Sequence, residues 1–290
     1  MKFRDVVTVT AVLATALSAC KDDSGVTGPA PLEPAALVRF INAASDTGTV
    51  DLRFVDRVEN LPTFQGVAFR GTSGVYQRVI PGARPTRVFP NSTDPDFASL
   101  RLVDTTITLE ANKRYTLVYA GRARGNQDRL VVFEEPLELP TPPAGSIAIR
   151  ALHVAVGVAD VDVHIAPDRA VADPLPRPNP VATAAARIDG VSYLELTPFV
   201  NVARRTPTDT LPLMTFGVTP TGSTTLTFST RSTLTGAAST VSTVGPQPGI
   251  QIAGSVLTAI IFPGGTAGSP AASVSTSPAV VLIPDKPLNP

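Results

Sequence analysis

The feature that most constrains the fold is an internal repeat. The segment that begins at Leu37 aligns without a gap to the segment that begins at Ala148, at an offset of 111 residues. The identities at this offset are Arg39 with Arg150, Ala44 with Ala155, and Val50-Asp51 with Val161-Asp162. Later segments keep the same order at wider spacing, as expected when insertions fall in surface loops. We therefore predict two copies of one unit, the second with longer loops.

The first copy has the pattern of short β-strands. In one of them Val50, Leu52 and Phe54 would face a core while Asp51 and Arg53 face water, because successive side chains of a strand point to opposite faces. The predicted strands are 37–43, 49–55, 66–69, 74–80, 86–89, 98–109, 113–120 and 129–134. The 29 prolines of the chain favour short elements. The predicted fold class is all-β, with two tandem immunoglobulin-like β-sandwich domains.

The N-terminus predicts export and lipid anchoring. An uncharged run of 12 residues over 6–17 is too short to cross a ~30 Å hydrocarbon layer but suits a signal peptide. It ends in Leu17-Ser18-Ala19-Cys20, and Cys20 is the only cysteine of the chain. This stretch resembles the bacterial lipobox, which implies acylation of Cys20. The alternative is an ordinary cleaved signal peptide with a cysteine there by chance.

The predicted organisation has six consecutive parts. They are a lipoprotein signal peptide (1–19), a lipidated flexible tether (20–36), a first sandwich (37–136), a proline-rich linker (137–146), a second sandwich (147–284) and a tail (285–290). Several acyl chains hold a protein durably on a bilayer, so we expect localisation in the bacterial cell envelope. Lys21, in place of the aspartate that retains lipoproteins at the inner membrane, favours the outer membrane or cell surface.

The opening of each copy is similar to the bacterial "domain of unknown function 4397" family. Units of that family open with a pattern close to Arg-x-x-His-Ala-Ser-Pro-Asp-x-Pro-x-Val-Asp-Val. The matching residues are Arg39, Ala43, Asp46, Val50 and Asp51 in the first copy, and Arg150, His153, Val161, Asp162 and Val163 in the second. Asn42 replaces the histidine in the first copy and Gly157 replaces the loop aspartate in the second. The resemblance implies a secreted or lipidated tandem-repeat protein without an assigned activity.

Two sets of charged residues are candidates for sites. Arg39 and Asp51 lie on either side of a predicted bend, as do Arg150 and Asp162, so we predict one structural ion pair in each copy, worth about 0.2–1 kcal/mol if exposed. Asp160, Asp162 and His164 alternate along one strand and would share a face, where carboxylates and imidazole suit a metal ion. The equivalent strand of the first copy carries Arg53 at the third position, which argues for a solvated face. We predict no metal site and no cofactor.

Catalysis is not expected. The chain has two histidines, and a serine or cysteine hydrolase needs a base beside an activated nucleophile. No Gly-x-Ser-x-Gly segment is present, and Cys20 would carry lipid. We expect His153 to bond loop backbone at a strand end. The 24 basic and 24 acidic residues balance, which excludes the electrostatic footprint of a nucleic-acid-binding protein.

The predicted function is non-enzymatic display of two sandwich modules on a lipid anchor, for structural or binding roles. The partners would be the membrane, through the anchor, and a protein or glycan outside the cell or in the periplasm. One alternative is a carbohydrate- or matrix-binding module, which an exposed row of Tyr76, Tyr115 and Tyr119 would favour. A second is a hydrolase that uses His153 or the face formed by Asp160, Asp162 and His164.

Overall fold

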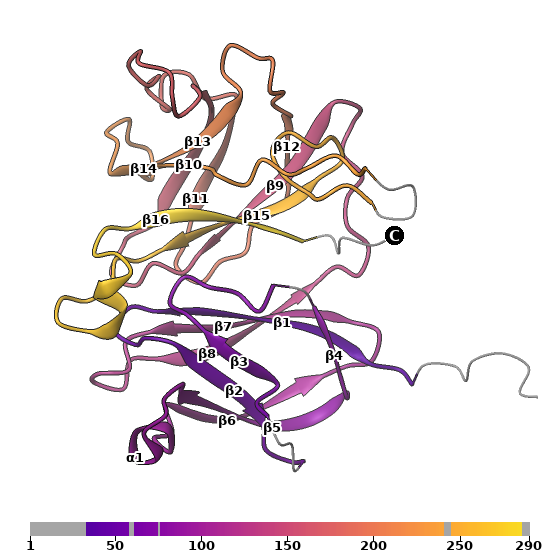
Figure 1. Ribbon diagram of the computed structural model, residues 1–290, viewed down its shortest axis with the longest axis vertical. Coiled ribbons are helices and arrows are strands. Elements are labelled where there is room, and N and C mark those ends of the chain that lie inside the picture. The colour runs from indigo at the N-terminus through magenta and orange to yellow at the C-terminus, as the bar shows by residue number, and fades with distance from the viewer. Residues whose placement is uncertain (1–32, 58–60, 75, 241–244, 286–290) are drawn as a thin grey trace, which may run out of the picture. The chain divides into compact units, whose positions relative to one another are not determined.

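The protein is all-β, as predicted. The computed structural model describes residues 33–57, 61–74, 76–240 and 245–285, and the residues from Ala35 onward form one compact unit. Within the described part, sixteen strands form four sheets of four strands each (Figure 1). No helix among these residues is long and apolar enough to span a bilayer.

Eight strands build the first sandwich. They are β1 (Ala36–Ala44), β2 (Val50–Phe54), β3 (Phe64–Val67), β4 (Gln77–Val79), β5 (Gly82–Pro90), β6 (Val103–Leu109), β7 (Arg114–Gly121) and β8 (Arg129–Glu135), with the short helix α1 (Pro95–Ala98) between β5 and β6. One sheet has the order β4-β1-β7-β8 and the other β3-β2-β5-β6. Each of the eight predicted strands overlaps one of these.

The second sandwich repeats this plan. Its strands are β9 (Ser146–His153), β10 (Val161–Asp168), β11 (Ala186–Val191), β12 (Val200–Ala203), β13 (Leu213–Pro220), β14 (Phe228–Arg231), β15 (Val256–Phe262) and β16 (Ala279–Pro284), with a 3-10 helix η1 (Pro270–Ser273) between the last two. The sheet orders, β12-β9-β15-β16 and β11-β10-β13-β14, are those of the first sandwich with every label raised by eight.

Each sandwich contains one parallel strand pair. β1 runs parallel to β7, and β9 runs parallel to β15, whereas the other pairings are antiparallel. Alternation of apolar and polar residues assigns a strand to a face but not to a neighbour, so the sequence does not reveal this pairing.

The two sandwiches share a third apolar cluster. On β1, Val38 and Phe40 point into the core of the first sandwich, while Ile41 and Ala43 point the other way and pack against residues of β9 and β15. The buried members of this cluster are Ile41, Ala43, Val118, Ala120, Leu152, Val154, Ile260, Phe262 and Ile283. The sheet with β1 and β7 and the sheet with β15 and β16 are adjacent in Figure 1. Both faces of these strands are therefore buried, which explains why β7 and β15 are buried along their whole length.

The loop between β15 and β16 reaches back to the first sandwich. The backbone N–H of Thr266 donates to the carbonyl of Ser45 at 2.6 Å, and Arg70 Nη2 donates to the carbonyl of Pro263 at 2.6 Å. These two hydrogen bonds join loops of the two sandwiches, and they add a polar contact beside the shared apolar cluster.

Candidate functional site

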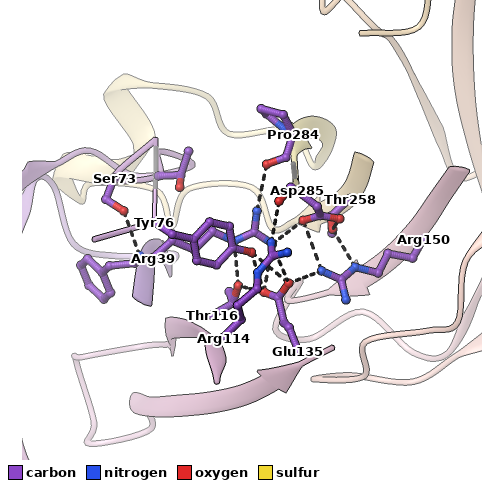
Figure 2. Close-up of polar contacts among 12 residues, drawn as sticks. Arg39, Ser73, Tyr76, Arg114, Thr116, Glu135, Arg150, Thr258, Pro284 and Asp285 are labelled. Carbon is purple, nitrogen blue, oxygen red and sulfur yellow. Dashed lines mark hydrogen bonds and ion pairs between the residues drawn. The ribbon is translucent and has the colours of Figure 1, made fainter. Parts of the chain in front are cut away.

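Four charged side chains meet where the two sandwiches face each other (Figure 2). Arg39 Nη2 lies 3.2 Å from Glu135 Oε1 and 2.7 Å from Asp285 Oδ1. Arg150 Nη2 lies 2.5 Å from Glu135 Oε2 and 3.2 Å from Asp285 Oδ1. Each arginine thus contacts both acids, and each side chain is at most 2% exposed. We call these four residues the charge ring.

The charge ring has an internal two-fold relation. Thr116 on β7 accepts a hydrogen bond from Nε of Arg39 at 2.7 Å and donates to the acid of its own sandwich, Glu135. Thr258 on β15 repeats both bonds in the second sandwich, at 2.9 Å from its arginine and 2.6 Å from its acid. Each guanidinium also reaches the acid of the opposite sandwich, so the ring links the two halves through the ion pairs Arg39–Asp285 and Arg150–Glu135.

Aromatic rings cover both arginines. The Tyr76 ring, just before β4, lies 4.9 Å from the guanidinium carbon of Arg39 and 4.3 Å from that of Arg114. In the second sandwich Phe199, just before β12, lies 4.7 Å from the guanidinium carbon of Arg150. Such contacts stabilise a guanidinium that has left water. Tyr76 also donates through its hydroxyl to the carboxylate of Glu135 at 2.9 Å.

The arginines keep the ring ionised. Burial alone would raise the pKa of Glu135, but the charges of Arg39 and Arg150 outweigh this effect and hold its pKa at about 2. Burial also opposes the charge of Arg39, yet Asp285, Tyr76 and Glu135 raise its pKa. A buried ion pair needs such compensation, because taking each ion out of water costs several kcal/mol.

The predicted pairs Arg39–Asp51 and Arg150–Asp162 do not form among the described residues. Val38 and Phe40 on β1 point into the first core, so Arg39 points outward from that sheet towards the second sandwich. Val50 and Leu52 on β2 point into the same core from the facing sheet, so Asp51 points outward on the other side. The body of the sandwich separates the two charges, and the same geometry separates Arg150 from Asp162.

Asp51 and Asp162 have a different structural role. Asp51 Oδ1 accepts from the backbone N–H of Gly66 at 2.7 Å, and Asp162 Oδ1 accepts from that of Gly190 at 2.8 Å. Both glycines have positive φ, 65° and 63°, and both stand opposite the aspartate where the strand register shifts. Each aspartate therefore satisfies the donor of a β-bulge glycine, a conformation that side chains with a Cβ resist.

Asn42 and His153 occupy equivalent positions and brace equivalent loops. Asn42 Nδ2 donates to the carbonyl of Gly48 at 2.8 Å. His153 Nδ1 accepts from the backbone N–H of Ala155 at 3.1 Å, and its Nε2 lies 3.3 Å from the carbonyl oxygen of Ala159. Burial lowers the pKa of His153. The expected contact of His153 with loop backbone is observed.

The face formed by Asp160, Asp162 and His164 does not make a cluster of ligands. His164 Nε2 lies 3.1 Å from Thr219 Oγ1, and the second oxygen of Asp162 accepts from the backbone N–H of Gly222 at 2.9 Å. Asp160 is exposed and immediately precedes β10. Over the residues with described positions, no group of three or more His, Cys, Asp or Glu side chains could hold a metal ion.

The tyrosines do not form an exposed row. Tyr115 and Tyr119 belong to the core of the first sandwich, at 3% and 0% exposure. Tyr76 is half-buried between two guanidinium groups. The feature that would favour sugar stacking is therefore missing from this sheet. Cys20 and the predicted signal peptide lie outside the described residues, so lipidation stays a prediction.

Residues 36–164 match the model of a family described as "Domain of unknown function (DUF4397)". The resemblance seen in the sequence is confirmed. The match takes in the whole first sandwich, β9, and β10 as far as His164, and therefore includes Arg39, Glu135 and Arg150 but not Asp285. No curated protein matches the chain.

Two solved structures show weak similarity. The C-terminal domain of AlgF from P. aeruginosa is 17% identical, with a TM-score of 0.26, over 36% of this chain and 100% of that chain. A "putative cell adhesion protein" from Bacteroides uniformis ATCC 8492 is 10% identical, with a TM-score of 0.19, over 89% of this chain and 99% of that chain. Similarity at these scores carries no argument about function.

Sequence reasoning missed Glu135 and Asp285 as partners of the arginines. Adjacent residues of a strand point to opposite faces, and Glu134 is exposed with its carboxylate 2.9 Å from Lys113 Nζ, while Glu135 is buried. The signal that was available is the repeat itself. Thr116 and Thr258 align between the copies and lie on fully buried strands, which indicates a shared polar position on a buried face.

Proposed function

We propose that this chain is a non-enzymatic protein of the bacterial cell envelope, anchored by lipid on Cys20, that displays two rigidly joined β-sandwiches for structural or binding roles. The observation that carries the proposal is the use of its buried ionisable groups. The charge ring, the two bulge aspartates and His153 are all bonded to neighbouring protein groups that hold sheets and loops in place.

This use of polar groups argues against catalysis by the residues that the sequence singled out. A general acid or base must reach a substrate proton directly or through one water. Asp162 and His164 are 0% and 3% exposed, and His153 has 0% exposure with contacts from both ring nitrogens to loop backbone. A hydrolase built on these side chains would need to open the sandwich.

The joined sandwiches suit display. An apolar cluster and a four-membered ion network between the sheets resist relative motion, and loops at the sandwich ends face outward for contact. The positions between Cys20 and the first described residue, Glu33, are rich in glycine, proline and polar residues, a composition typical of a spacer. A protein at the outer membrane or cell surface would present these loops to a glycan or to another protein.

The test is metabolic labelling of the full chain with an alkyne fatty acid, followed by membrane fractionation. We expect labelled wild type in the membrane fraction, and loss of both label and membrane association in Cys20→Ala. Ser18→Ala is the matched control, because alanine at that position still fits the lipobox, and it should keep the label. Unlabelled wild type in the aqueous fraction would refute the anchor.

A second experiment addresses the displayed modules. The full chain carrying Cys20→Ala is screened against glycan arrays and envelope proteins. Saturable binding that depends on exposed loop residues would support a binding role, whereas turnover of an ester or glycoside substrate would contradict the non-enzymatic proposal.

A further inference from the structure

A cavity of about 340 Å³ lies where the linker passes the first sandwich. Its walls come from the starts of β1 and β7, the segment before β4, the linker, and Gly254 shortly before β15. Its lining includes Leu37, Tyr76, Arg114, Leu137, Leu139 and Pro142. The volume falls in the range of small-ligand pockets, which are mostly apolar with a few placed polar groups.

The charged group of this cavity is Arg114, the first residue of β7. The residue is 4% exposed. Its Nη2 donates to the carbonyl of Asp285 at 2.5 Å and lies 3.9 Å from Glu135 Oε2, too far for a hydrogen bond. Its Nε has no hydrogen-bond partner among the described residues. A buried guanidinium with an unmatched donor is costly unless an acceptor reaches it.

The charges around Arg114 also favour an anion as the ligand. Among the described residues, three arginines, Arg39, Arg114 and Arg150, adjoin two acids, Glu135 and Asp285. The Tyr76 phenol also belongs to this cluster, and burial raises its pKa to about 12, so it stays neutral. Counted over the described residues, the cluster carries one positive charge more than its acids neutralise, and Arg114 is the arginine on the cavity wall.

We propose that this cavity binds an alkyl monocarboxylate. The carboxylate would pair with the guanidinium of Arg114 through a charge-assisted hydrogen bond. The alkyl chain would lie along Leu37, Leu137 and Leu139. This ligand supplies a negative charge and an acceptor beside Arg114, and it places its apolar part on an apolar wall.

The second sandwich provides an internal contrast. Val256 begins β15 and stands opposite Ala148, as Arg114 stands opposite Leu37. The cation is therefore present in the first sandwich alone, while the rest of the strand plan repeats. If the cation were required by the shared fold, the second sandwich would also carry one at this position.

The experiment is calorimetric titration of octanoate into the full chain carrying Cys20→Ala, without detergent or lipid. We expect saturable binding with one site, and binding of octanamide weaker by about tenfold or more, because the amide lacks the charge that pairs with arginine. Arg114→Val, which copies the second sandwich, should abolish the preference for the carboxylate.

Leu137→Asp keeps the test decisive if Arg114→Val fails to fold. Leu137 is 54% exposed, so the aspartate is tolerated but repels a carboxylate from the cavity, and octanoate binding should be lost. Leu61→Asp is the matched control at a leucine with 64% exposure that does not line the cavity, and it should bind as the parent does. The proposal is overturned if octanoate binding does not saturate, if octanoate binds no better than octanamide, or if Leu137→Asp leaves octanoate affinity unchanged.

Discussion

The outer sheets of the two sandwiches share one plan but meet different surroundings. In the first sandwich Arg53 of β2 stands opposite Arg87 of β5, and the Arg87 side chain is 38% exposed. In the second, the equivalent pair is His164 of β10 and Gly217 of β13, and His164 is 3% exposed. The same strand position is therefore a solvated face in one sandwich and an interior in the other.

The cover of the second face comes from the long loop after β10. Pro180 of this loop is buried against Gly217, where a Cβ would lie 2.8 Å from Pro180 Cγ. The loop is held by Asp168, whose carboxylate accepts from Arg177 at 2.7 Å and from Arg231 at 3.0 Å. The order of strands therefore does not determine which sheet face is exposed to solvent, because one inserted loop can bury a polar face.

The largest effect is expected at the charge ring, which lies on the other two sheets and joins the sandwiches. Glu135→Ala leaves Arg39 and Arg150 buried without one of their two acids, and breaking a buried pair costs about 3–5 kcal/mol. We expect a loss of unfolding free energy of that size in urea titration. Glu134→Ala, the exposed neighbour, should change it by less than about 0.5 kcal/mol. Equal effects of the two variants would contradict the ring.

Acid should weaken the same contact. The pKa of Glu135 is about 2, below its ordinary value of 4.5, so the folded state favours the ionised form. Its contribution is complete above the ordinary value and is lost as the pH falls from about 5 to 2. We expect the unfolding free energy to fall over this interval. Glu135→Gln should flatten the fall, and an unchanged slope would rule out Glu135 as its source.

Removal of the two bulge aspartates should have unequal effects on stability, with the larger loss on the buried face of β10. Asp162 is fully buried and accepts from Gly190, Gly222 and Arg187, whereas Asp51 is half-buried. Removing an acceptor costs more when its donors stay buried. We expect Asp162→Ala to cost about 2–3 kcal/mol and Asp51→Ala about 1 kcal/mol in thermal or urea unfolding. The reverse order would show that the cover over β10 does not exclude water.

The smallest effects concern the opposed pair Gly217 and Arg87. Gly217→Ala would press Pro180 outward and cost about 1 kcal/mol, in the range of mild overpacking. Arg87→Ala, on the open face, should change the free energy of unfolding by less than about 0.5 kcal/mol. Proteolysis of the loop after β10 gives a second measurement, because Gly217→Ala should speed its cleavage and Arg87→Ala should not.

Local patterns in the sequence were enough for the strands and the repeat. Alternation along 49–55 predicts that Val50, Leu52 and Phe54 face the core, and the structure places them there. The aligned Val-Asp pairs predict a shared structural role, and the bulge glycines supply it. These features depend on neighbours along one strand or across one strand pair, so the sequence carries them directly.

Tertiary structure alone decided the partners across sheets. Arg39 was expected to pair with Asp51, which is near in sequence but points out of the opposite face of the sandwich. Its acids are instead Glu135, 96 residues away, and Asp285, at the end of the second sandwich. Strand alternation specifies the face on which a side chain lies, but not what packs against that face. That depends on how whole sheets stack, which in this chain is set by an apolar cluster shared between residues far apart in sequence.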